Sequence, residues 1–243
     1  MNTLYDTIGL NYANLRKPDF RIAQRIENAL GNAKAILNVG AGAGSYEPVG
    51  KEITAVEPSS KMIAQRSDSN ATVIQGSAED LPFGDKAFDA SMAVLTIHHW
   101  SDQEKGVMEM RRVTRDKIVF LTYDPSFRGF WLADYFPALI TLDEVQMPKI
   151  SSYEKWLGSI KVSPVPIPHD CSDSFLTGYW RRPAAYLDER VRAAMSPFWA
   201  LDDVSEGLRK HEADLKSGAW EQFYSDLLDL EELDCGYRLV ATN

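Results

Sequence analysis

Three glycines at alternate positions, in the run Gly40-Ala41-Gly42-Ala43-Gly44, directly follow an apolar stretch at residues 35–39. Glycine has no Cβ, so a ligand can approach its backbone more closely than that of any other residue. A second apolar stretch, residues 53–56, is followed at once by Glu57. A carboxylate there can accept hydrogen bonds from both hydroxyls of a ribose, each contributing roughly 1.5–3 kcal/mol. Together the two features predict a nucleotide site.

The spacing of the glycines narrows the type of nucleotide. A dinucleotide-binding fingerprint has glycine at relative positions one, three and six. Counted from Gly40 the sixth residue is Ser45, and counted from Gly42 it is Glu47. The spacing therefore disfavours a nicotinamide oxidoreductase, although such an enzyme would share the same kind of sheet and stays open as an alternative.

A sheet is needed to position these residues. Short apolar runs alternate with helical patterns along the first half of the chain, at residues 35–39, 53–56, 71–74, 88–95 and 117–122. Strands separated by helices indicate βαβ units and a parallel sheet that is covered on both faces. Ligands bind such sheets outside the carboxyl ends of the strands, where the glycines and Glu57 lie.

Capping signals place three helices between and before these strands. A helix is expected to begin after Pro18-Asp19 and to end at Gly31. Ser59 is a cap for a second helix, and Ser101 with Glu104 reads as a capping box for a third.

Prolines at every second position, Pro164, Pro166 and Pro168, interrupt a β-prone run that starts at Ile160. Alternate strand residues point their N–H groups to the same side, so these prolines remove donors from one side only. The run therefore suits an outermost strand, with residues 237–242 as its partner. The predicted fold is α/β: a Rossmann-like, seven-stranded, mostly parallel sheet with helices on both faces, an antiparallel C-terminal hairpin and helical lid insertions.

The sequence resembles the class I S-adenosylmethionine-dependent methyltransferases, in particular the type 11-like branch with small-molecule acceptors. The resemblance is carried, in the family's order and spacing, by residues 38–44, 56–59, 76–83, 88–89 and 97–100. It implies an enzyme that binds S-adenosylmethionine and transfers its methyl group to an O, N or C atom by in-line displacement. We expect one domain, 1–243, with N-terminal lid helices (1–32), a cofactor-binding core (33–122), and an acceptor lid with the C-terminal strands (123–243).

The resemblance also implies roles for residues of the first two strand ends. Gly40, Ala41 and Gly42 would line the methionine part of the cofactor. Glu57 would hold the ribose diol, and Pro58 would lie under the adenine.

Residues that follow the third and fourth strands would complete the cofactor site. Ser77, Ala78 and Glu79 would surround the adenine edge. Ala93 and Val94 would contact the amino-acid end of the cofactor.

The N-terminal segment and a histidine pair supply further candidates. Residues 5–16 resemble the lid of the family, so Tyr12 would close over the cofactor and Arg16 would pair with its carboxylate. The alternative is a surface helix with Arg16 in water. His98 is the candidate catalytic base, because the imidazole pKa lies near neutral pH. A structural or cofactor-positioning role is the alternative for this histidine.

More than half of the aromatic residues lie between residues 120 and 199. A dry pocket suits methyl transfer, since water would compete as an acceptor. Some of these aromatics are expected to form the core of the added helices. The candidates for the walls of an apolar acceptor pocket are Phe127, Phe130, Trp131, Tyr135, Phe136, Trp156, Tyr179 and Trp180.

The composition limits the partners of the protein. The net charge of −9 argues against a nucleic-acid binder and against docking on anionic lipid. No metal site is expected from two cysteines and four histidines, and no membrane span or export signal is recognised, so we expect a cytoplasmic protein. A non-catalytic or regulatory S-adenosylmethionine-binding protein stays open. An RNA methyltransferase using a local basic face, formed by Arg111, Arg112, Arg115 and Lys117, is less favoured. The oligomeric state and the acceptor are not predicted.

Overall fold

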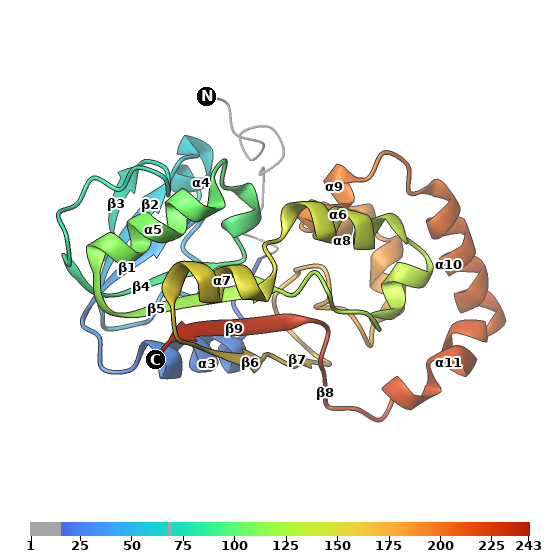
Figure 1. Ribbon diagram of the computed structural model, residues 1–243. Helices are drawn as coiled ribbons and strands as arrows, with labels where there is room; N and C mark the ends of the chain where they lie inside the picture. The colour runs from blue at the N-terminus through green and yellow to red at the C-terminus, as the bar shows by residue number, and fades with distance from the viewer. Residues whose placement is uncertain (1–15, 68–69) are drawn as a thin grey trace.

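A seven-stranded mixed sheet organises the computed structural model of the protein, which describes residues 16–67 and 70–243 (Figure 1). Its strand order is β3-β2-β1-β4-β5-β9-β6. The five parallel strands are β1 (Ala35–Val39), β2 (Glu52–Glu57), β3 (Thr72–Gln75), β4 (Phe88–Val94) and β5 (Thr114–Tyr123). The strand β9 (Tyr237–Thr242) runs antiparallel between β5 and β6 (Ile160–Pro164). The fold predicted from the sequence is confirmed.

Both faces of the sheet are covered by apolar packing. On β5, Val119 and Leu121 face the side of α3 (Phe20–Leu30), whereas Ile118 and Phe120 face α5 (Gln103–Val113) and α7 (Ile150–Leu157). The alternation follows from the pleat, which sends successive side chains to opposite faces. A short helix, α4 (Ser60–Ala64), follows β2.

The capping residues agree with the sequence analysis in two of three cases. Asp19 caps the start of α3, and Gly31 is the cap that follows its last residue. The Ser59 hydroxyl accepts a hydrogen bond from the Met62 N–H at the start of α4. The third prediction was wrong by one residue, because the carboxylate of Asp102 caps α5. The Ser101 hydroxyl instead donates to Glu79.

The proline-rich run forms an edge, as predicted, but it divides in two. The strand β6 pairs only with β9 and ends at Pro164. Pro168 lies in a separate two-residue strand, β7 (Ile167–Pro168), that pairs with β8 (Glu232–Leu233).

A second lobe of short helices lies beside the sheet and is inserted around β6 and β9 (Figure 1). Its elements are η2 (Trp131–Asp134), α6 (Ala138–Gln146), η3 (Pro183–Leu187), α8 (Glu189–Arg192), α9 (Ser196–Ala200), α10 (Ser205–Ser217), α11 (Ala219–Phe223) and η4 (Ser225–Leu227). We call this lobe the lid. No helix in residues 16–67 and 70–243 could cross a membrane.

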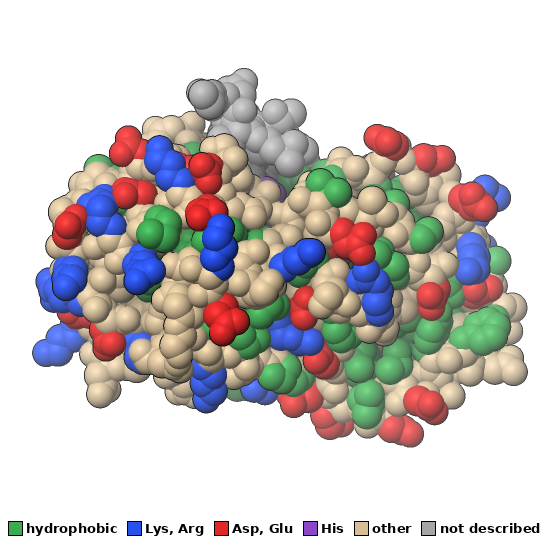
Figure 2. Space-filling model, in the orientation of Figure 1, with side chains coloured by type: hydrophobic (Ala, Val, Ile, Leu, Met, Phe, Trp, Pro, Cys, Tyr) green, Lys and Arg blue, Asp and Glu red, His purple; other side chains and the backbone are tan. Residues whose placement is uncertain are grey.

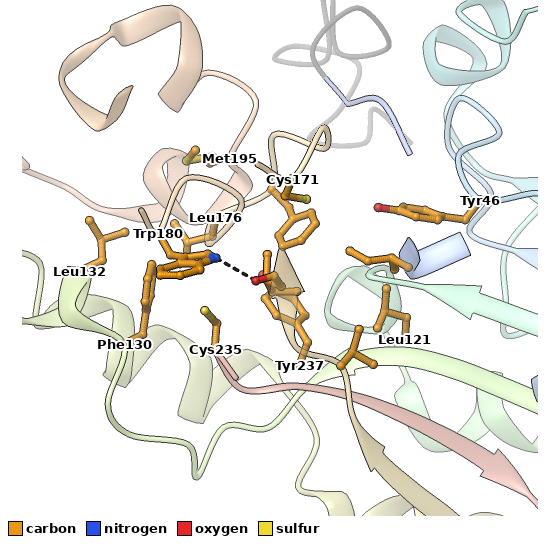
Figure 3. Packing of buried hydrophobic residues seen from close by; sticks show 14 of the residues in the cluster. Tyr46, Leu121, Phe130, Leu132, Cys171, Leu176, Trp180, Met195, Cys235 and Tyr237 are labelled. Atoms are coloured by element: carbon orange, nitrogen blue, oxygen red, sulfur yellow. Dashed lines mark hydrogen bonds between the residues drawn. The ribbon is translucent and has the colours of Figure 1, made fainter. Parts of the chain in front are cut away.

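Aromatic side chains form the core of the lid. The Trp131 indole donates to the Trp180 carbonyl at 2.9 Å. The Trp180 indole in turn donates to the Ile167 carbonyl at 2.8 Å (Figure 3). The same apolar cluster continues to Leu121 and Tyr237 of the sheet. The aromatics proposed as pocket walls therefore pack in or against the core instead. The division into residues 1–32, 33–122 and 123–243 stays a prediction.

Candidate functional site

A cavity of about 590 Å³ opens at the carboxyl ends of β1, β2 and β4. Its size lies within the roughly 300–1,000 Å³ range of small-molecule sites. Most of the residues implied by the family resemblance line it, namely Arg16, Gly40, Ala41, Gly42, Glu57, Pro58, Ser77, Ala78, Glu79 and Val94. Tyr12 lies outside the described residues.

Ala93 does not line either of the two described cavities. Its side chain is buried in the apolar cluster on the α5 side of the sheet. Val94, the next residue of β4, reaches the 590 Å³ cavity. Neighbouring strand residues face opposite sides of the sheet, so the Ala93 side chain points away from the cavity, and its contact with the cofactor stays a prediction.

The glycine run is held against the end of β2. The N–H groups of Gly40 and Ala41 donate to the Val56 carbonyl at 2.8 and 3.1 Å. Gly40 has a φ of 68°, and a Cβ there would lie 2.1 Å from the Thr96 hydroxyl oxygen. Gly40 is therefore required both by its left-handed backbone and by the close approach of Thr96.

Glu57 also fastens this loop. Its side chain is buried, and its two oxygens accept hydrogen bonds from the N–H groups of Gly42 at 2.8 Å and Ser59 at 2.9 Å. A carboxylate offers about four lone-pair sites, so two backbone donors do not exhaust its acceptor capacity. The carboxylate is thus fixed in position at the cavity wall.

An ion pair that the sequence analysis did not predict holds the glycine run in position. Arg66 donates to both oxygens of Glu47 at 2.6 and 2.7 Å, and both side chains are nearly buried. Asn38 at the end of β1 donates to Glu47 at 2.9 Å, and Arg66 also donates to the Gly42 carbonyl at 3.4 Å. Asn38 therefore positions the loop through Glu47.

Glu79 links two loops around the cavity. It accepts hydrogen bonds from the N–H and hydroxyl of Ser101 at 2.7 and 2.9 Å, and from the Asp102 N–H at 3.2 Å. Burial alone would raise the pKa of Glu79, but these donors lower it below the usual value. Glu79 is thereby kept ionised and in place.

Arg16 is paired within the protein and is not in water. Its guanidinium donates to both oxygens of Asp173 at 2.5 and 3.2 Å, and the Tyr46 hydroxyl donates to the same carboxylate at 2.8 Å. The alternative that places Arg16 in water is wrong, because its side chain is 11% exposed. The helix of that alternative lies outside the described residues. The guanidinium still lines the cavity beside this pair.

A second cavity of about 110 Å³ adjoins the first and shares Arg16, Leu95 and His99 with it. Leu95 follows β4 with a φ of 50°, an uncommon conformation for a residue with a branched side chain. Residues of the sheet, the 3-10 helix η1 (Ile97–His99) and the lid form its wall, among them His98, Tyr123, Asp143, Gln146, Met147, Phe175, Leu176, Met195, Pro197 and Tyr237.

The two histidines lie between these cavities, with ring centroids 3.8 Å apart. Within the described residues, the buried Nδ1 of His98 has no hydrogen-bond partner. Burial, with further contributions from His99 and Arg16, holds the pKa of His98 well below its usual range. Burial lowers the pKa of His99 to about 4. Both imidazoles are therefore neutral at physiological pH.

Opposite His98, the second cavity carries an acid and two phenols. Burial raises the pKa of Asp143 to about 7, and the positive charge of Arg128 only partly offsets this. Tyr123 and Tyr237 meet edge to face at 5.5 Å, and burial, followed by nearby acidic groups, raises the pKa of Tyr123. Sequence reasoning missed all three residues, because nothing local marks an acid of α6 as facing a cavity.

The fold and the larger cavity define an α/β protein with a cavity at the carboxyl ends of its parallel strands, and comparison with known proteins defines the family. A family model described as a methyltransferase domain matches residues 37–121. The solved structure of a putative methyltransferase from an antibiotic biosynthesis pathway of Anabaena variabilis is 36% identical. The match covers 94% of this chain and 99% of that chain, with a TM-score of 0.87.

Two curated relatives match over shorter stretches. The 2-methyl-6-phytyl-1,4-hydroquinone methyltransferase 2 of rice is 34% identical over 35% of this chain and 23% of its own length. The demethylmenaquinone methyltransferase of Thermotoga maritima is 33% identical over 35% of this chain and 41% of its own. The chain thus matches less than half the length of each curated relative.

The chain belongs to the class I S-adenosylmethionine-dependent methyltransferases. The predictions of this enzyme family and of S-adenosylmethionine as the cofactor are confirmed.

Proposed function

We propose that this protein transfers a methyl group from S-adenosylmethionine to a small organic molecule. The proposal rests on the 590 Å³ cavity, where the glycine run and the buried carboxylate of Glu57 meet at adjacent strand ends. When bound, S-adenosylmethionine supplies a methyl group on a positively charged sulfonium. The residues of the chain hold, orient and desolvate the reacting groups, and such proximity effects can supply about 7–11 kcal/mol.

Individual roles follow from where the residues lie. Glu57 accepts the ribose hydroxyls, while Gly40 and Gly42 offer backbone along the methionine part. Pro58 and Ala78 border the adenine. These assignments, together with those for Ala41, Ser77, Glu79 and Val94, are part of the proposal, and Tyr12 as a closing residue stays a prediction.

A small acceptor is supported by the site and by the relatives. The second cavity, of about 110 Å³, lies next to the larger one, and a protein that only binds the cofactor has no need for it. The two curated relatives are named for acting on a phytyl hydroquinone and a demethylmenaquinone, both small molecules.

An RNA acceptor is not favoured by the basic residues that could have supported it. Arg111 and Lys117 donate to backbone carbonyls, and Arg112 and Arg115 form ion pairs with Glu109 and Asp89. Figure 2 shows acidic side chains interspersed with the basic ones on the face of α5 and α7. Phosphate binding needs a concentrated basic surface.

Calorimetric titration with S-adenosylhomocysteine, compared with NAD, tests the proposal. We expect one S-adenosylhomocysteine to bind per chain and NAD not to bind. Incubation with methyl-labelled S-adenosylmethionine and a library of small phenols, amines and carbonyl compounds should then label at least one small product. Absence of S-adenosylhomocysteine binding would remove the proposed function.

A further inference from the structure

We propose that the second cavity binds the methyl acceptor, that Asp143 removes a proton from it, and that it is a small, uncharged, flat molecule carrying a hydroxyl group. The inference rests on the proposed function, because it assigns the substrate class and a catalytic residue for the same reaction.

The position of the cavity is the first argument. Leu95, His99 and Arg16 separate it from the larger cavity and line both. Leu95 directly follows Val94, where the amino-acid end of the cofactor is proposed to lie, so a molecule in the second cavity would be next to the reacting methyl. The lid supplies the opposite wall through α6 and α9, which places an acceptor between sheet and lid.

The walls select a flat, mostly apolar molecule. Tyr237 packs edge to face against Tyr123 at 5.5 Å and lies 5.0 Å from the ring of Phe175. Met147 and Met195 add flexible apolar surface, which adapts to the outline of a ligand. A cavity of about 150 Å³ can hold benzene. The second cavity, of about 110 Å³, is smaller than this, so a single ring would fill it and the rest of the molecule would extend outward.

The charges of the cavity argue for a neutral acceptor. A carboxylate would meet Asp143, and an ammonium would share the cavity with the guanidinium of Arg16 beside the sulfonium of the cofactor. A hydroxyl avoids both conflicts and satisfies Asp143, whose carboxylate has no hydrogen bond or ion pair with the described residues. Arg128 does not neutralise it directly, since it pairs with exposed Glu144. The titratable and charged groups around Asp143 are Arg16, His98, His99, Tyr123, Arg128 and Tyr237.

Asp143 is the group suited to act as the base. Its pKa of about 7 lies near the working pH, which is where general bases are most effective. His98, the candidate base from the sequence, has a pKa well below its usual range and is a weaker base. In the proposed step the acceptor oxygen bonds to the methyl carbon as the carbon–sulfur bond breaks. The electron pair of that bond stays on sulfur, and the hydroxyl proton passes to Asp143.

The test compares wild type with Asp143→Asn. Glu154→Gln is the control, because it also converts a carboxylate to an amide, at an exposed site on α7. Each protein is loaded with S-adenosylhomocysteine and titrated with 4-methylphenol, benzylamine and 4-methylbenzoate. Methyl transfer from labelled S-adenosylmethionine to 4-methylphenol is then followed against pH.

We expect wild type to bind 4-methylphenol in preference to the other two probes. Asp143→Asn should bind S-adenosylhomocysteine normally but lose about 100-fold or more in methyl transfer, together with the activity rise near neutral pH. Glu154→Gln should match wild type within about twofold. Preference for benzylamine or 4-methylbenzoate, no binding of 4-methylphenol, or equal rates in the two variants would overturn the inference. Failure to bind S-adenosylhomocysteine at all would instead refute the proposed function on which it rests.

Discussion

Replacement of Glu57 by glutamine should weaken the binding of S-adenosylhomocysteine by about 10–100-fold. Glu57 is 6% exposed, and its carboxylate accepts hydrogen bonds from the Gly42 and Ser59 N–H groups at 2.8 and 2.9 Å. The carboxylate therefore cannot rotate away from the cavity wall. Glutamine keeps one acceptor oxygen and replaces the other by an NH₂ donor. That NH₂ group must face either a backbone N–H or a ribose hydroxyl.

The magnitude follows from one lost charge-assisted hydrogen bond. Such a bond contributes roughly 1.5–3 kcal/mol, and each 1.4 kcal/mol changes a dissociation constant about tenfold. The loss should appear in affinity more than in stability, because one of the two backbone contacts can persist. Isothermal titration calorimetry measures the first quantity, and thermal unfolding without ligand measures the second.

Glu52→Gln is the matched control, because it makes the same change in the same strand. Glu52 is exposed at the opposite, amino end of β2. Its substitution should leave the dissociation constant unchanged within about twofold. If Glu57→Gln bound S-adenosylhomocysteine as tightly as this control, the ribose assignment would be refuted.

Three further substitutions probe the site and its supports. Gly40→Ala should lower both the melting temperature and the affinity for S-adenosylhomocysteine, because the alanine Cβ would overlap the Thr96 hydroxyl. Unchanged values of both quantities would contradict the conclusion that glycine is required at this position. Asp173→Asn should lower the free energy of unfolding in urea by about 3–5 kcal/mol, because it removes the negative charge that pairs with the nearly buried guanidinium of Arg16. A loss below about 1 kcal/mol would show that this pair contributes no more to stability than an exposed ion pair. Burial raises the pKa of Asp143 from 3.8 to about 7, so the folded protein binds this proton more tightly and loses stability as pH rises between those values. Asp143→Asn should therefore raise the melting temperature at about pH 8 but not at about pH 4, and an equal shift at both would count against a buried acid.

The strand ends could be predicted because their signals are local. Apolar runs, glycines and Glu57 are neighbours in sequence, and parallel strands bring their carboxyl ends to one edge of the sheet. The two-residue alternation along β4 is a local signal of the same kind. It separates the side chain of Ala93, in the core, from that of Val94, at the cavity.

The supports of the site could not be predicted, because they join distant parts of the chain. Arg16 and Asp173 are separated by 157 residues, and no spacing rule connects an N-terminal arginine to an aspartate after β7. The aromatic-rich stretch was ambiguous for a different reason. Phe, Trp and Tyr serve equally as core and as pocket wall, and only the tertiary packing shows that Trp131 and Trp180 are core.

Three features that cost stability meet at the second cavity. Leu95 adopts a positive φ, the buried Nδ1 of His98 has no partner among the described residues, and Asp143 is desolvated without an ion pair. Each costs of order 1–3 kcal/mol in a folded protein. Their presence around one cavity, beside the proposed cofactor cavity, is what a bound acceptor would explain, because its hydroxyl group would satisfy polar groups that the chain leaves unmatched.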